Sequence, residues 1–100
     1  MVSMKREEIL ARIASLLPEA RRLYAVRELA VFGSVARDEA KASSDVDVLV
    51  EFEDKTTFDR FMGLKFYLED SLGVPIDLVT RKALRSELRQ RIEREAIHVP

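Results

Sequence analysis

The 100-residue chain has no cysteine and no tryptophan, and it has only three glycines, three prolines and one histidine. Without cysteine it can form neither a disulfide nor a thiolate metal site, which fits a reducing compartment. With 17 basic and 18 acidic residues the net charge is −1. No overall basic field therefore exists to hold nucleic acid, and direct nucleic-acid binding is not expected.

Long apolar runs are also missing. The longest are about four residues, against the roughly 20 that a membrane-spanning helix needs. The first ten residues, MVSMKREEIL, carry charges where a signal peptide would be apolar. Hydrophobic residues make up 47% of the chain and charged residues 35%, the balance of a globular protein. We expect a single cytoplasmic domain spanning residues 1–100, without membrane contact.

Hydrophobic periodicity predicts helices alternating with short strands, in the order αβαβαβα. A fold of the α/β (α+β) class, with a small sheet packed against about four helices, follows from that order. The expected strands span Glu28–Phe32, Asp45–Phe52 and Val74–Val79. The expected helices are a first helix that breaks near Pro18, a short helix capped by Ser34, and a helix from Thr56 or Thr57 to Leu72. A last helix is expected to be capped by Thr80 and to carry an apolar stripe through Leu84, Leu88, Ile92 and Ala96.

One stretch, residues 31–51 (VFGSVARDEAKASSDVDVLVE), carries the strongest functional signal. Asp45 and Asp47 are two residues apart at the start of a strand, so their side chains should leave the same face. Two carboxylates roughly 6–7 Å apart repel each other by about 2–3 kcal/mol at an effective dielectric near 20. A divalent cation such as Mg²⁺ would turn that repulsion into attraction.

Asp77 interrupts a second apolar strand, VPIDLV. Taken alone, Asp45 or Asp77 could be a strand-end or turn residue facing water. The combination of three aspartates with a preceding Gly33-Ser34 turn is a more specific pattern. It suits two-metal nucleotidyl transfer, in which carboxylates bridge two cations and a third acid completes the site and helps to take the nucleophile's proton. Gly33 would let the backbone approach phosphate, and Ser34 would offer a hydroxyl to it.

The segment GSVARDEAKASSDVDVLVEF resembles the signature of the DNA polymerase beta-type nucleotidyltransferase superfamily: a Gly-Ser pair, about ten residues, then Asp-x-Asp. The short chain and the later GVPIDLVT segment resemble its minimal nucleotidyltransferase (MNT) branch. This resemblance implies a small three-stranded mixed sheet flanked by helices. It also implies that Asp45, Asp47 and Asp77 bind two Mg²⁺ ions and that ATP is the substrate.

The resemblance further implies a partner, because MNT proteins are typically paired with HEPN-domain toxins and transfer AMP to a toxin tyrosine as antitoxins. Two positions depart from the family pattern. Relatives commonly have glycine where this chain has Asp38, and many have a basic residue where it has Val35. Arg37 could contact the triphosphate or simply lie in solvent. His98, alone near the chain end, is a poor candidate for metal binding or catalysis.

Three functional hypotheses follow. The first is a magnesium-dependent protein adenylyltransferase that acts as the antitoxin of a HEPN toxin. The second is an antitoxin that neutralises its toxin by binding alone. The third, a small-molecule nucleotidyltransferase, is disfavoured because the chain has little room for a separate acceptor domain.

Overall fold

The computed structural model describes residues 5–40 and 45–100. Its elements are α1 (Arg6–Tyr24), β1 (Val26–Phe32), α2 (Gly33–Ala36), β2 (Val46–Phe52), α3 (Phe58–Leu72), β3 (Ile76–Thr80), the 3-10 helix η1 (Arg81–Ala83), α4 (Ser86–Glu95) and β4 (Ile97–His98). The strands form one sheet in the order β3-β2-β1-β4. β2 runs parallel to β3 and antiparallel to β1, and β4 is antiparallel to β1, so the sheet is mixed.

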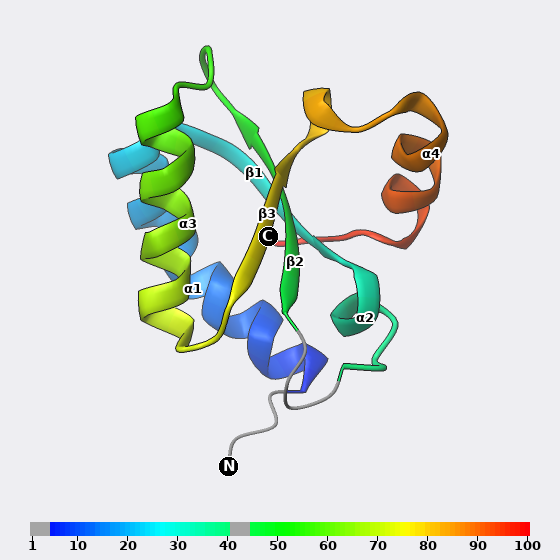
Figure 1. Cartoon of the computed structure of the whole chain (residues 1–100). Helices are drawn as coiled ribbons and strands as arrows, with labels where there is room; N and C mark the ends of the chain where they lie inside the picture. The colour runs from blue at the N-terminus through cyan, green and yellow to red at the C-terminus, as the bar shows by residue number, and fades with distance from the viewer. Residues whose placement is uncertain (1–4, 41–44) are drawn as a thin grey trace.

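The sheet has two differently covered faces (Figure 1). Helices α1 and α3 lie side by side over one, here called the α1/α3 face, and α4 stands on the other, the α4 face. The largest fully buried side chains are Ile13, Leu17, Leu29, Leu64, Leu68, Val26, Val31, Val35, Val48 and Val50. Helix α4, in contrast, contains no buried residue. Each fully buried aliphatic side chain contributes about 1.5–3 kcal/mol of transfer free energy, so the layer between the sheet and the helices α1 and α3 provides most of the stability.

Helix α3 confirms its prediction closely. Thr57 caps it by accepting a hydrogen bond from the Arg60 N–H at 3.1 Å, and Gly73 ends it in the left-handed region at φ 72°. A Cβ on Gly63 would lie 2.7 Å from a ring carbon of Tyr24, so this glycine allows α1 and α3 to approach closely. The side chain of Phe58, the first residue of the helix, is 78% exposed.

The expected break at Pro18 does not occur, because α1 continues through it to Tyr24. Proline removes one backbone donor and leaves the carbonyl four residues earlier without its usual partner. Pro18 lies on the exposed side of α1, where water can hydrate that carbonyl. None of the helices in the described part of the chain is long and apolar enough to cross a membrane.

The C-terminal region differs most from expectation. Thr80 caps the short η1 instead of a long helix, accepting a hydrogen bond from the Ala83 N–H at 3.3 Å. Helix α4 begins only at Ser86, and the last residues form β4, in which His98 pairs with Ala30 of β1. The sheet therefore has four strands, not three, and His98 belongs to it. A two-residue strand has no periodicity of its own to reveal it in sequence.

Candidate active site

Asp47 and Asp77 lie directly opposite each other on the parallel strands β2 and β3. Because opposed residues share a sheet face, both project from the α4 face. Asp47 is half-buried and Asp77 is exposed. Asp45 is exposed and immediately precedes β2. The second and third strands thus bring Asp47 and Asp77 together at one end of the sheet.

The electrostatics of this end are unfavourable for Asp47 as an anion. Its pKa is raised to about 6, first by burial, then by the charge of Asp77 and a hydrogen bond with it, and then by the charge of Asp45. Arg37 acts in the opposite direction. A divalent cation would relieve this repulsion, and carboxylate oxygens are the ligands that Mg²⁺ prefers. The pair Asp47–Asp77 therefore fits a magnesium ion.

A preformed set of three metal ligands is a separate question from this pair. Among residues 5–40 and 45–100, no group of three or more acidic, histidine or cysteine side chains is arranged to hold a metal ion. Asp47 and Asp77 form a facing pair, and Asp45 lies near enough to affect the pKa of Asp47. The role of Asp45 as a third ligand thus stays a prediction.

Gly33 is required at the site for two physical reasons. It lies in the left-handed region at φ 72°, and a Cβ there would lie 2.0 Å from Oδ2 of Asp47. Any side chain at this position would be strained and would displace the Asp47 carboxylate. The glycine predicted to admit phosphate also makes room for a predicted metal ligand.

Ser34 does not cap α2, which corrects the sequence expectation. Helix α2 spans Gly33–Ala36, its N-cap is Phe32, and Ser34 is already inside the helix. The Ser34 carbonyl accepts a hydrogen bond from the Glu39 N–H at 2.8 Å. Binding of phosphate by the Ser34 hydroxyl stays a prediction.

The two departures from the family pattern have structural explanations. Asp38 adopts φ 59°, a conformation that glycine accepts freely and aspartate tolerates better than most residues. Val35 is 2% exposed and belongs to the core, so a basic side chain would not suit that position in this chain. Neither substitution removes a candidate ligand.

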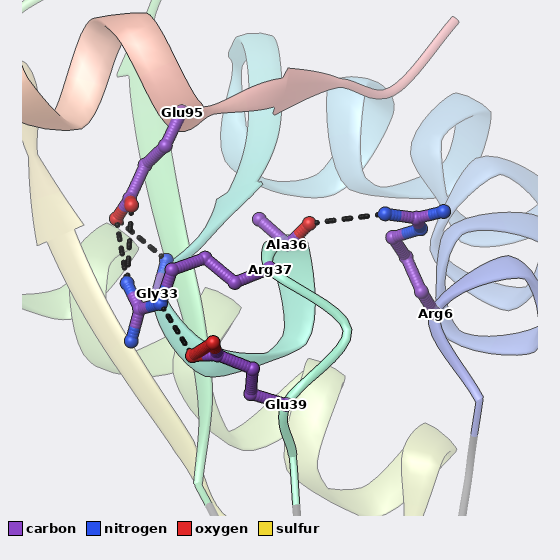
Figure 2. A network of polar contacts seen from close by, with 6 residues as sticks. All are labelled: Arg6, Gly33, Ala36, Arg37, Glu39 and Glu95. Atoms are coloured by element: carbon purple, nitrogen blue, oxygen red, sulfur yellow. Dashed lines mark hydrogen bonds and ion pairs between the residues drawn. The ribbon is translucent and has the colours of Figure 1, made fainter.

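Arg37 does lie at the site, held by two carboxylates (Figure 2). Its Nε donates to Oε1 of Glu39 at 3.0 Å, and its Nη1 donates to Oε2 of Glu95 at 3.0 Å. Both bonds raise the pKa of Arg37, that to Glu39 first. The Gly33 N–H also donates to Glu95 Oε1, at 3.1 Å. On the other side of α2, Arg6 of α1 donates to the Ala36 carbonyl at 3.3 Å.

Glu95 is the site residue that sequence reasoning missed. In the sequence it is one of several acids on an arginine-rich helix, a pattern typical of a solvated surface. Only the pairing of β4 with β1 brings it beside Gly33. A separate hollow of about 480 Å³, lined by residues 50–56 and 80–82 together with Arg27 and Arg89, lies at the opposite end of β2 and β3 from the aspartates.

Comparisons with known proteins show the family of the chain. The model of the nucleotidyltransferase domain family matches residues 13–99. The protein adenylyltransferase MntA of Thermococcus cleftensis is 40% identical over 99 residues, covering 99% of this chain and 100% of that protein. A solved structure of a candidate minimal nucleotidyltransferase superposes with a TM-score of 0.84 at 40% identity, over 97% of this chain and 98% of that one.

A more distant solved structure shares the fold. It contains a tri-AMPylated Shewanella oneidensis HEPN toxin in complex with an MNT antitoxin, and it has a TM-score of 0.68 at 19% identity, over 95% of this chain and 71% of that one. The family match spans most of the sequence, and it includes Gly33, Asp47, Asp77 and Glu95. The chain therefore belongs to the nucleotidyltransferase domain family, and within it to the minimal nucleotidyltransferases that its Gly-Ser and Asp-x-Asp motifs resemble.

Proposed function

We propose that this nucleotidyltransferase moves AMP from ATP to a hydroxyl, that of a tyrosine, on a HEPN-type toxin, and so acts as its antitoxin. The observation that carries the proposal is the facing pair Asp47–Asp77 beside the Gly33 turn. Similarity to an MntA protein adenylyltransferase over the whole chain supports the acceptor class. A fold shared with an MNT antitoxin supports the choice of partner.

The candidate site residues would divide the tasks of the proposed reaction among them. Asp45, Asp47 and Asp77 would hold two Mg²⁺ ions, which supply charge neutralisation for the triphosphate and a lowered pKa for the attacking hydroxyl. The Gly33 N–H and Arg37 would orient phosphate oxygens. Asp77, whose side chain is exposed, would accept the hydroxyl proton. The hydroxyl oxygen then bonds to the α-phosphorus, the bond from that phosphorus to the β-phosphate oxygen breaks, and pyrophosphate leaves with the electron pair.

Mass spectrometry of the partner tests the proposal. The protein encoded beside this chain, expected to be small, helical and to carry Arg-x4-His, is incubated with the chain, ATP and Mg²⁺. We expect AMP additions that disappear in Asp45→Asn and Asp47→Asn. Asp54→Asn is the matched control, because it removes the same charge from the turn at the far end of β2.

The outcome also separates the hypotheses. An unmodified partner that is nevertheless inhibited in a stable complex would overturn the enzymatic proposal in favour of neutralisation by binding alone. Replacing the partner's tyrosines by phenylalanine one at a time identifies the acceptor. Modification that persists in every such variant would contradict a tyrosine acceptor.

A further inference from the structure

Two donors at the candidate site are bound by a carboxylate of the chain itself, that of Glu95, the last residue of α4. Its carboxylate accepts the Gly33 N–H at 3.1 Å and binds Arg37 Nη1 through both oxygens, at 3.0 and 3.3 Å (Figure 2). A backbone N–H together with a guanidinium is a donor set that suits a phosphate oxygen equally well. Glu95 thus fills the anion position with a group from the chain itself.

The fold holds Glu95 there through β4. Ile97 pairs with Val31 and His98 with Ala30, and the Val99 N–H donates to the Leu29 carbonyl at 2.9 Å. Two residues further along the same antiparallel register, Glu95 comes opposite Gly33. Its side chain is only 23% exposed, although the helix that carries it has no buried residue. The backbone pairing of β4 with β1 therefore holds Glu95 beside Gly33.

The same donors cannot serve Glu95 and a phosphate group at once. Arg37 has a single Nη1 directed at Glu95, and Gly33 has a single N–H. Glu95 also brings a negative charge to an end of the sheet where Asp45, Asp47 and Asp77 already gather. A triphosphate entering this site would meet both occupied donors and an added repulsion.

We propose that Glu95 is an internal anionic plug: it occupies the phosphate position of the resting protein, and a nucleoside triphosphate must displace it to bind. The identity of the displacing ligand rests on the proposed function. Displacement frees Arg37 and the Gly33 N–H while β4 keeps α4 tethered nearby. The plug lowers apparent nucleotide affinity by the free energy of its own contacts, which any competing ligand has to exceed.

The sign of one substitution separates a plug from a positioning residue. Glu95→Gln keeps the shape of the side chain and removes its charge, so a plug predicts tighter binding of ATP. If Glu95 instead oriented Arg37 for phosphate, the same substitution would weaken binding. Glu39→Gln is the matched control, because Glu39 binds the same guanidinium through Nε and is 64% exposed.

The experiment is calorimetric titration of ATP and of inorganic tripolyphosphate, each with Mg²⁺, into the wild type, Glu95→Gln, Glu95→Ala and Glu39→Gln. A charge-assisted contact predicts affinities about 5- to 10-fold higher in both Glu95 variants. We expect Glu39→Gln to stay within about twofold of the wild type, as for an exposed pair. Equal ATP affinity in all four proteins, or weaker binding in the Glu95 variants, would overturn the plug while leaving the nucleotide site intact.

The inorganic probe distinguishes the plug from the proposed function. Tripolyphosphate that binds tighter to the Glu95 variants, with no binding of ATP to any protein, would support the plug and contradict adenylyl transfer. An independent readout is the backbone amide resonance of Gly33. On saturation with tripolyphosphate it should reach the same position in the wild type as in Glu95→Ala, because phosphate is then the acceptor in both, and a wild-type resonance that stays in place while the ligand binds would contradict displacement.

Discussion

On the α1/α3 face of the sheet, Val31, Val48 and Val50 are completely buried. On the α4 face, the same strands carry the facing pair Asp47 and Asp77, beside a helix without a single buried residue. Strand alternation makes both possible at once, because every second residue can serve the core while its neighbours serve the site. The buried core and the candidate site thus lie on opposite sides of one short strand.

The carboxylates on the α4 face lower the free energy of unfolding by mutual repulsion, a cost that the apolar α1/α3 face does not have. The raised pKa of Asp47 reports a carboxylate that is partly desolvated and surrounded by like charge. Such strain is typical of functional sites and is offset by packing elsewhere. The difference between the faces can be tested by paired substitutions, beginning with the largest expected effect.

Truncation of one leucine on each side gives the widest contrast. Leu64 of α3 is completely buried, and Leu64→Ala should lower the free energy of unfolding by about 2–5 kcal/mol. Leu88 of α4 is 46% exposed, and Leu88→Ala should change it by less than about 0.5 kcal/mol. Urea unfolding followed by circular dichroism measures both. Equal losses would show that α4 packs on the sheet as firmly as α3.

Substitutions at two glycines with the same φ angle separate the effect of backbone strain from that of a steric clash. Gly33 and Gly73 both have φ 72°, but only at Gly33 would a Cβ meet another atom within 4 Å, Oδ2 of Asp47 at 2.0 Å. Gly73→Ala should cost about 1 kcal/mol from the backbone alone. Gly33→Ala should cost about 1–2 kcal/mol more, and it should abolish adenylyl transfer that Gly73→Ala retains. Similar stability and activity in the two variants would contradict the close approach to Asp47.

The pH dependence of stability tests the strain on Asp47 directly. Its pKa in the folded protein, about 6, is above the value of 3.8 expected without the fold. The folded state therefore binds more protons between these values, and stability falls as pH rises from about 4 to 6. Asp47→Asn removes this loss. Because Asp47 is half-exposed and screened, we expect a gain of only about 1 kcal/mol at pH 7.5 in EDTA.

The same variant should show a much smaller gain at pH 4, where Asp47 is protonated in the folded state and about half ionised in the unfolded state. Thermal unfolding at the two pH values provides the measurement. Mg²⁺ should stabilise the wild type more than Asp47→Asn at pH 7.5, since a bound ion removes the repulsion. A variant that is less stable than the wild type at pH 7.5 in EDTA would contradict the pKa shift.

The smallest expected effect concerns the departure at Asp38. Asp38→Gly relieves a positive φ of 59° and should stabilise the protein by about 0.5–1 kcal/mol. It also removes a negative charge one residue from Arg37, so ATP should bind up to about twofold tighter. Ala25→Gly is the control, because Ala25 has φ 56° at the end of α1. It should stabilise similarly without affecting ATP binding, and an equal effect of both variants on ATP binding would exclude a role for the charge.

Local pattern was sufficient for much of the fold. The limits of α3, its Thr57 cap and its Gly73 end follow from signals within a few residues. The buried series Val46, Val48 and Val50 follows from strand alternation. The pairing of Asp47 with Asp77 could also be predicted from the sequence. Each residue interrupts an apolar strand, so the two aspartates come together if the strands are adjacent. The predicted helix break at Pro18 was wrong, because the effect of a proline depends on whether its side of the helix faces water.

By itself, the sequence determined which residues can form the core, where α3 begins and ends, and which acids and glycine are candidates for the site, since these depend on residue type and short spacing. Only the tertiary structure decided that the chain ends in a fourth strand and that Glu95 meets Gly33 and Arg37. Those contacts join residues some 60 positions apart. Two-residue β4 is too short to have a pattern, so its place depends on the exposed edge that β1 offers it.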